Sequence, residues 1–367
     1  MKTLSKAGIG AVGAVAIVLS QVSPAMADLA PQANDVVGVG SDTAQFGVEF
    51  LADGDQNGDI GYNASNTSHR MASFDATGDA YGTATANAMI LLRANTVPVA
   101  RPNGSGAGIS ALNKDTGTAE TINFVRSSRL PTSVEQNTAK TNGWGGLHVY
   151  QFATDTLKIA VSNKVTTDAP AALTPTDLVN IYQGTYTTWG QVPGYAGSAP
   201  TAAIKPYLPQ AGSGTRNFFL ADLKAANNNV DVTLSTNVQT MQEHDPSSIM
   251  STADAVAPFS VGRFNLLNTG YLGATNQNSV ALLGGTGTYS NTRGLYVIVR
   301  ERDVADTTAP VSLSGISYPF QVGGTKNWVQ TLFAGATSWM GRSANAPLIN
   351  SAGVTRSYAD LGDVFSG

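Results

Sequence analysis

The sequence predicts an α/β protein built from two domains. Short apolar runs that end in glycine or polar turns alternate with stretches of helical periodicity, which is the order of elements expected for this class. The chain has 367 residues, and removal of an amino-terminal segment of 27 residues leaves 367 − 27 = 340, enough for two cores. We find no internal repeat and no low-complexity linker, so the domain boundaries have to follow from the order of the elements.

The first residues have the pattern of a secretory signal peptide. Lys2 and Lys6 precede the apolar run 7–19, and Ala25-Met26-Ala27 places small residues at a cleavage site. We therefore expect cleavage after Ala27 and a secreted, extracytoplasmic protein. The sequence has no cysteine, so it offers neither disulfides nor a cysteine to which a lipid could be attached.

The charge of the mature chain argues against a polyanionic partner. The whole sequence has 21 Lys and Arg and 25 Asp and Glu, and the segment 1–27 contains two of the lysines and no acid, so the mature net charge is 19 − 25 = −6. Nucleic acids and anionic membranes attract proteins through basic patches, and an acidic chain without such a patch is a poor match. A small anion would have to be bound by local hydrogen-bond donors.

The first strand and helix predict one group of such donors. An apolar run at 35–40 ends in glycine, Ser41, Asp42 and Thr43 follow, and helical spacing begins at Phe46. The start of a helix presents unpaired backbone N–H groups and the positive end of the helix dipole. The three polar residues therefore either contact an anion or cap the helix, and the sequence leaves both interpretations open.

A second group of polar residues lies further along the same predicted domain. Ser105 and Gly106 precede a helical pattern, and the apolar strand 122–125 runs directly into Arg126, Ser127, Ser128 and Arg129. In open α/β sheets ligands bind at the carboxyl ends of the strands, which predicts a role for Arg126, Ser128 and Arg129. The alternative for the two arginines is an ordinary salt bridge.

The clearest candidate for an anion-binding turn comes in the second half of the chain. Ser213, Gly214, Thr215 and Arg216 lead into the apolar helical pattern 218–223. Glycine lets the backbone approach a ligand closely, and the two hydroxyl groups add donors to those of the helix start. A simple N-cap remains the alternative for Ser213.

Other stretches predict the framework that carries these turns. The longest strand-like run is 149–161, and a helix is expected to begin at Pro175 with Thr174 as its cap and to end at Gly184. A strand is expected at 294–299 and a helix at about 326–340. No Cys or His cluster has metal-ligand spacing, so we expect no cofactor and no structural metal.

The acidic segment 53–59 resembles the first half of an EF-hand calcium loop. Asp53, Asp55 and Asn57 occupy the first, third and fifth positions and Gly58 the sixth, but Ala64 stands where the bidentate glutamate should be. Because so many ligands are missing, a solvated turn of the Asx type is the favoured interpretation.

A hydrolase is a further possibility that the sequence leaves open. Serine is abundant, and His69, His148 and His244 could each act as a base. However, the sequence contains no Gly-x-Ser-x-Gly motif and no recognisable catalytic spacing around a histidine.

The order and the residues of these motifs resemble the extracytoplasmic solute-binding proteins of phosphate ABC importers. The shared segments, in order along the chain, are 38–43, 105–106, 123–129, 173–189, 212–215 and 350–353. The resemblance implies a two-lobed periplasmic-binding-protein type II fold with two hinge crossings, a ligand cleft between the lobes and no enzymatic activity. It places the first lobe at 28–153 plus 292–367 and the second at 154–291, with Asp155 and Arg293 near the hinges.

The resemblance also implies a ligand, a partner and a site. It implies phosphate or a related oxyanion as the ligand, an importer permease as a partner, and a monomeric receptor that binds no nucleic acid. The ligand-binding residues that it implies are Ser41, Asp42, Thr43, Ser105, Gly106, Arg126, Ser128, Arg129, Ser213, Gly214, Thr215 and Arg216. An anion-binding module of the cell surface or the medium, not coupled to transport, is the alternative.

The chain departs from the phosphate-binding pattern at three positions. Pro209 and Ala211 stand where the family has an arginine and an aspartate before the Ser213 turn, and Ser128 stands where it has a carboxylate. The positive charge would then come from Arg126, Arg129 or Arg216. Asp42 is the nearest acidic residue that could replace the missing carboxylate, accept the proton of phosphate and so disfavour sulfate. The alternative for Asp42, which the sequence slightly favours, is that it only caps its helix.

Overall fold

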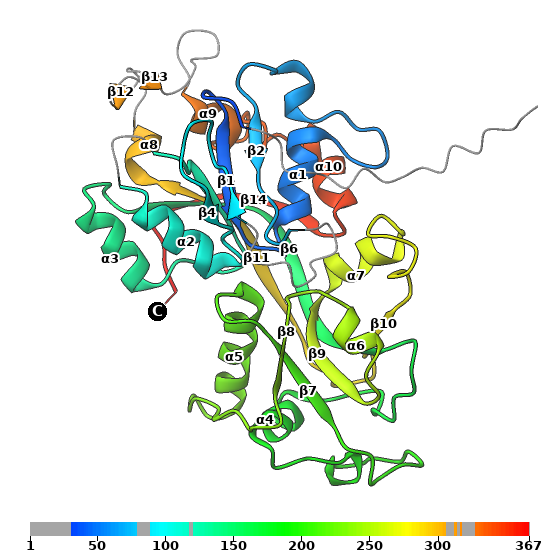
Figure 1. Cartoon of the computed structure of the whole chain (residues 1–367). Helices are drawn as coiled ribbons and strands as arrows, with labels where there is room; N and C mark the ends of the chain where they lie inside the picture. Colours follow the sequence, from blue (N-terminus) through cyan, green and yellow to red (C-terminus); the bar gives the residue numbers. More distant parts are fainter. Residues whose placement is uncertain are drawn as a thin grey trace, which may run out of the picture.

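The computed structural model describes residues 31–78, 89–116, 120–305, 312–313, 316–317 and 327–366. They form two lobes, and two long antiparallel strands run from one lobe into the other (Figure 1). These strands are β6 (Leu147–Ser162) and β11 (Ser290–Arg300). The predicted α/β class and two-lobed architecture are confirmed. The signal peptide predicted at 1–27 lies outside the described residues.

The first lobe contains the parallel strands that precede the predicted anion loops. β1 (Val36–Gly40) lies between β2 (Met71–Ser73) and β5 (Phe124–Ser127), and β5 pairs antiparallel with β11. All five residues of β1 are buried, as expected for a parallel strand covered on both faces. The helices of this part are α1 (Gln45–Asp53), α2 (Ser105–Lys114) and α3 (Ser133–Thr141).

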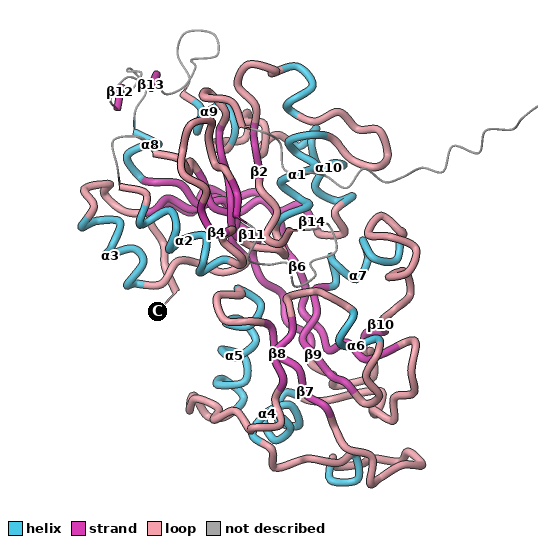
Figure 2. Tube along the Cα trace, in the orientation of Figure 1, coloured by secondary structure: helices cyan, strands magenta, loops and turns pink. Residues whose placement is uncertain are grey.

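The second lobe repeats the arrangement of three parallel strands beside a crossing strand (Figure 2). β7 (Lys205–Pro209) is parallel to β8 (Gln239–Met241) and to β9 (Ala255–Ser260), and β9 pairs with β6. A short strand, β10 (Val280–Leu282), also pairs with β6. The helices here are α4 (Pro175–Gln183), α5 (Gly214–Ala226), α6 (Ser247–Met250) and α7 (Val261–Asn268).

Helix α4 begins and ends as the sequence predicts. The Thr174 side chain accepts a hydrogen bond from the Asp177 N–H, Pro175 is the first helical residue, and Gly184 ends the helix in the left-handed region at φ 82°. The apolar residues Leu178, Ile181 and Tyr182 all lie on its buried face. Cap, first-turn proline and terminal glycine are local signals, and all three hold in the folded chain.

The carboxyl-terminal segment returns to the first lobe. Its last strand, β14 (Thr355–Gly362), pairs antiparallel with β6. The helix predicted at about 326–340 is wrong beyond its first turns, because α9 ends at Leu332 and Gly335 adopts φ 81°. The other elements of this part are α8 (Glu301–Ala305), α9 (Trp328–Leu332) and α10 (Ala346–Ser351).

The remaining elements are short. They are the strands β3 (Met89–Ile90), β4 (Val99–Ala100), β12 (Ser312–Leu313) and β13 (Ile316–Ser317), and the 3-10 turns at Tyr62–Ser65, Trp189–Gln191 and Ser343–Asn345. No helix in the described ranges has the length and apolar character needed to cross a membrane.

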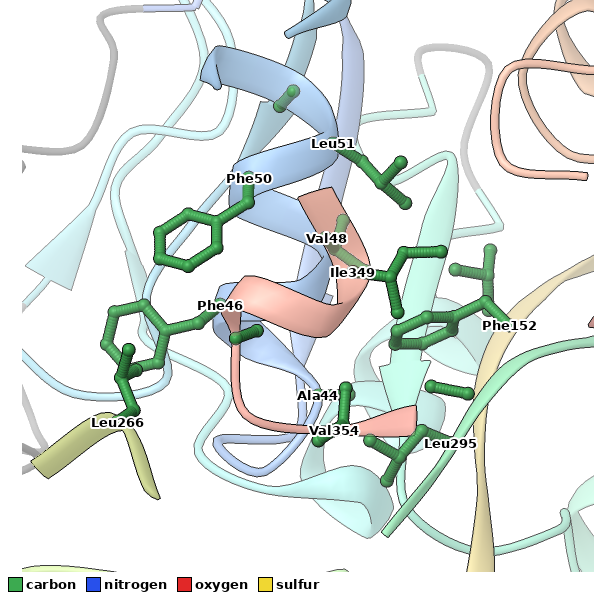
Figure 3. Packing of buried hydrophobic residues seen from close by; sticks show 14 of the residues in the cluster. Ala44, Phe46, Val48, Phe50, Leu51, Phe152, Leu266, Leu295, Ile349 and Val354 are labelled. Atoms are coloured by element: carbon green, nitrogen blue, oxygen red, sulfur yellow. The ribbon is translucent and has the colours of Figure 1, made fainter. Parts of the chain in front are cut away.

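The largest apolar cluster joins the two lobes near the crossing strands. Phe46 and Val48 of α1 pack with Ile349 of α10 and Phe152 of β6, and Leu266 of α7 approaches the same cluster (Figure 3). Tyr271, which follows α7, stacks edge-on against Phe46 with ring centroids 5.8 Å apart. The lobes are therefore in direct apolar contact beside the loops that the sequence assigns to the ligand.

Candidate functional site

The starts of three helices meet where the two lobes face each other. The Thr43 and Thr215 hydroxyls are 3.2 Å apart, and the Ser105 and Ser128 hydroxyls are 3.3 Å apart. The chain preceding α1 and α2 comes from the first lobe, whereas the chain preceding α5 comes from the second. Parallel pairing aligns the ends of β1 and β5 at one sheet edge, which is why Thr43 and Ser128 lie in the same region.

The polar residues at these helix starts have different hydrogen-bond partners. Ser213 is the N-cap of α5, since its hydroxyl accepts a hydrogen bond from the Arg216 N–H at 3.0 Å. Neither α1 nor α2 has a side-chain cap. Ser105 accepts from the Ser128 N–H at 2.9 Å instead. The hydroxyl of Ser41 is buried and has no hydrogen-bond partner among the described residues.

Gly214 and Gly106 bring the two lobes into direct contact. A Cβ atom built on Gly214 would overlap the hydroxyl oxygens of both Ser105 and Ser128. The Gly106 N–H donates to the Gly212 carbonyl at 3.0 Å across the lobes. The absence of a side chain at Gly214 is therefore needed for this close approach.

The three predicted arginines each bind other groups of the chain. Arg126 is fully buried and donates to the carbonyls of Ser41 (3.3 Å) and Phe74 (2.6 Å), beside the end of β1. Arg129 forms a two-pronged salt bridge with Glu135, at 2.7 and 2.8 Å, which is the alternative that the sequence left open. Arg216 donates to the Pro209 carbonyl at 2.8 Å, and partial burial lowers the pKa of its guanidinium.

An acid that sequence reasoning missed occupies the centre of the site. Glu243 lies in the loop after β8 and is completely buried. Its Oε1 atom accepts a hydrogen bond from the Thr43 hydroxyl at 3.0 Å and another from the Thr215 N–H at 3.2 Å. A carboxylate of the chain itself is thus bound by two groups that were expected to bind a free anion.

His244 contributes a hydrogen-bond donor next to this carboxylate. Its Nδ1 accepts from the Ser260 N–H at 3.5 Å, so the proton of the neutral ring lies on Nε2. Nε2 is 2.9 Å from the Thr43 hydroxyl oxygen and therefore donates to it. Burial, reinforced by Arg263 and Arg293, lowers the pKa of His244 well below its usual value. In this arrangement the His244 ring donates a hydrogen bond to Thr43.

Arg293 and Asp155 connect the crossing strands to the same cluster. They face each other across β11 and β6, and Arg293 Nη2 lies 3.1 Å from Asp155 Oδ2. The same nitrogen donates to the Thr43 hydroxyl at 3.3 Å. The other Asp155 oxygen accepts from the Ser260 hydroxyl and the Gly262 N–H, which secures the start of α7.

Asp42 is buried beside the cluster and faces a cation from the opposite lobe. Its Oδ1 is 3.4 Å from Arg263 Nη2, while its Oδ2 has no hydrogen-bond partner within the described chain. Burial raises the pKa of Asp42 to about 7, with a further increase from Glu243, although Arg263 and Arg126 oppose the shift. Asp42 forms this pair and does not cap α1.

The other sequence candidates lie away from the cluster. In the segment 53–59 the Asp55 carboxylate accepts from the N–H groups of Asn57 and Asp59, both at 2.9 Å, which is the predicted Asx-type turn. His148 lies between Glu301 (2.9 Å) and Asp360 (2.6 Å). The described part of the chain contains no group of three or more His, Cys, Asp or Glu residues arranged to bind a metal.

The sequence contained little signal for the residues that were missed. Asp155 and Arg293 could be placed near the crossings only through the family resemblance. Glu243 and His244 belong to no motif. Their loop follows a strand that is parallel to β7, and so it reaches the same edge of the sheet as the start of α5. This pairing depends on the fold and has no local sequence pattern.

A comparison with protein-family models identifies the family to which the chain belongs. A model of the PBP superfamily domain matches residues 67–313, more than half of the chain. A search of curated proteins gave no match.

Two solved structures described as phosphate transport proteins are similar to this chain in fold. A putative phosphate ABC transporter substrate-binding protein with bound phosphate, from Clostridium perfringens, superposes with a TM-score of 0.52 at 14% identity, covering 88% of this chain and 100% of that one. An ABC-type phosphate transport receptor from Vibrio cholerae gives a TM-score of 0.48 at 17% identity with the same two coverages. At these identities the likeness concerns the fold.

Proposed function

The chain belongs to the PBP superfamily, and from this premise we propose that it is a receptor that captures phosphate or a related oxyanion between its lobes. The proposal includes delivery of the anion to an ABC-type importer. The residues proposed to contact the anion are Thr43, Ser105, Gly214 and Thr215 at the three helix starts, together with Ser128 after β5.

The observation that carries the proposal is the way in which Glu243 is held. A carboxylate is itself an oxyanion, and one of its oxygens lies within hydrogen-bonding distance of Thr43 Oγ1 and the Thr215 N–H. One donor comes from each lobe, and the second is a backbone N–H in the first turn of α5, where the helix dipole favours negative charge. The donors are therefore already arranged for an oxygen that bears negative charge.

Buried cations near these donors support the same conclusion. Arg293 donates to Thr43, and Arg263 reaches across the lobes to Asp42. Nη1 of Arg293 and both Nε and Nη1 of Arg263 are buried without a hydrogen-bond partner in the described residues. Buried donors of this kind are costly unless a ligand or water satisfies them, so they favour an acceptor-rich ligand.

The structure from Clostridium perfringens adds an analogy for the biological role. That protein is a putative phosphate ABC transporter substrate-binding protein, and its structure contains bound phosphate. A shared fold does not fix the ligand. We therefore propose phosphate first and other tetrahedral oxyanions next, because the donors suit the class as a whole.

Calorimetric titration of the purified protein with phosphate, sulfate, nitrate and acetate tests this proposal. We expect one phosphate per chain, bound more tightly than sulfate, and no binding of chloride at the same ionic strength. Chloride is the control for non-specific screening of surface charge. The proposal is wrong if none of these oxyanions binds at millimolar concentration.

A further inference from the structure

We propose that Glu243 is a tethered internal ligand of the anion site. Its carboxylate lets the two lobes close without a free anion and competes with a free anion for the same donors. This inference rests on the proposed function, because it assumes that Thr43 and Thr215 bind an anion when the cleft is occupied.

The contacts of Glu243 bridge the lobes at the place where the ligand was predicted. The carboxylate accepts from Thr43, ahead of α1, and from Thr215, in the first turn of α5. Its second oxygen, Oε2, is buried and has no hydrogen-bond partner in the described chain. The donors of the site therefore satisfy one oxygen of this carboxylate and leave the other unpaired. We expect such an incomplete fit if the carboxylate occupies the place of a free anion.

The two donors that hold Glu243 are not available to a second oxyanion in this closed form. Thr43 and Thr215 are within hydrogen-bonding distance of each other, and Gly214 touches Ser105 and Ser128 without room for a Cβ atom. The Thr43 hydroxyl has a single hydrogen, which it donates to Glu243 Oε1, and the Thr215 N–H donates to the same oxygen. A free anion can therefore bind these two donors only if Glu243 leaves them.

The loop that carries Glu243 forms hydrogen bonds with both lobes. The Glu243 N–H donates to Gln210 Oε1 at 2.7 Å within the second lobe. Asn103 of the first lobe donates to Gln242 Oε1 at 2.9 Å. His244 adopts φ 58°, in the left-handed region that is unfavourable for a residue with a side chain. Strain of this kind persists where surrounding contacts compensate for it, and these contacts hold the carboxylate in place.

A tethered ligand weakens the apparent affinity for its free competitor. Because Glu243 is part of the chain, its effective concentration at the donors is high and does not fall on dilution. Anion binding must first break the two hydrogen bonds of Glu243. The observed dissociation constant for the anion therefore increases as the fraction of molecules in the self-bound state increases. Removal of the negative charge should release the site.

Phosphate titration of Glu243→Gln tests the competition. Glutamine keeps the shape of the side chain and removes its charge, and we expect this variant to bind inorganic phosphate about tenfold more tightly than the wild type, or better. Asp231→Asn is the matched control, because it removes one negative charge from an exposed residue of the second lobe. We expect its phosphate affinity to equal that of the wild type. Glu243→Ala provides a second charge-free variant if the glutamine fills the site.

A distance measurement tests the closure independently of affinity. The sequence has no cysteine, so Val134→Cys and Val230→Cys give one labelling site in each lobe, at residues that are 72% and 61% exposed. Without an anion, we expect the label-to-label distance to be short in the wild type and longer in Glu243→Gln. Phosphate should shorten the distance in Glu243→Gln and leave the wild-type distance almost unchanged.

The outcomes separate this inference from the proposed function. If the wild type binds phosphate and Glu243→Gln binds it equally or more weakly, Glu243 is a structural or ligand-contacting residue and the inference is overturned. The same holds if Glu243→Gln stays closed without an anion. If no variant binds any oxyanion, the proposed function fails, and the competition fails with it. The anion-free label distances then still report whether Glu243 closes the lobes.

Discussion

Asp42 is the residue whose burial should make the stability of the protein depend on pH. Its pKa rises from 3.8 to about 7, mainly because burial disfavours the charged form. Between these values the folded chain keeps a proton that the unfolded chain has lost. The stabilising contribution of Asp42 is therefore complete below pH 4. It decreases by about 1.4 kcal/mol per pH unit as the pH rises from there, and it is lost once the pH has passed 7.

Urea unfolding of wild type and Asp42→Asn between pH 5 and 8 measures this contribution. We expect the free energy of unfolding of the wild type to decrease more steeply with rising pH than that of the variant. The absolute stability of Asp42→Asn is not the readout, because the substitution also leaves Arg263 without its carboxylate. Parallel curves for the two proteins would show that Asp42 does not titrate in this range.

For single residues, the sequence predicted which helix starts come together better than it predicted the hydrogen-bond partner of each side chain. Thr43 and Thr215 do meet, because each follows a strand end or turn that the sequence marks clearly. Arg129 instead binds Glu135, which also completes the capping box of α3 with Thr132. That Thr-x-x-Glu spacing is readable in the sequence, but the pairing with Arg129 needs the turn at 130–132 to fold back.

Strands β6 and β11 should depend strongly on the ion pair between Asp155 and Arg293. Both side chains are buried, and Asp155→Ala would leave the Arg293 guanidinium without its carboxylate. Removal of one partner of a buried pair typically costs about 3–5 kcal/mol. We expect a loss of this size in the free energy of unfolding, measured by denaturant titration.

Thr156→Val is the matched control for this change. Thr156 is the next residue of β6, and its hydroxyl bonds to that of Thr292 in an exposed pair. Its loss should cost no more than about 0.5 kcal/mol, as is usual for surface substitutions. If the two variants were equally stable, the buried pair would have no special part in holding the strands together.

Among the elements, those with local signals were predicted and those set by packing were not. Strand β6 extends from Leu147 to Ser162, close to the predicted 149–161, and α4 has the predicted cap and end. The aromatic residues around Trp339 have helical spacing but pack from a series of turns. The Trp339 indole donates to the Leu51 carbonyl of α1, a tertiary contact that replaces the regular helix.

For the molecule as a whole, Gly214 should decide how closely the lobes can approach. An added Cβ would overlap hydroxyls of Ser105 and Ser128 on the opposite lobe, so Gly214→Ala should hold the lobes apart. Small-angle X-ray scattering without an anion should show a larger radius of gyration than for the wild type.

Gly284→Ala is the control for the added methyl group. Gly284 has no atom within 4 Å of its Cβ position, so we expect its scattering curve to match that of the wild type. An unchanged curve for Gly214→Ala would mean that the serines can move aside without separating the lobes.

For the whole molecule, the order of the motifs was sufficient to predict two lobes. It did not predict that Glu243 occupies the donors between them. The motifs are local and specify strands, turns and helix starts in sequence order. Occupation of the site by Glu243 depends on three segments far apart in the chain, which contribute Thr43, Thr215 and Glu243. The predicted boundaries 153/154 and 291/292 fall within β6 and β11 and remain a prediction.

The pairing of β14 with β6 and of β11 with β5 also determines the order in which the molecule can assemble during synthesis. Strands β7, β8 and β9 lie within residues 205–260 and pair with one another and with β6, so their sheet can form while the chain is still growing. The buried strand β5, which pairs with β1, needs β11 on its other side, and β6 needs β14, which ends at Gly362. These are contacts of long sequence separation, which form slowly. The strands that leave the ribosome first are therefore the last to be completed, and they are the part of the nascent chain that most needs protection from aggregation.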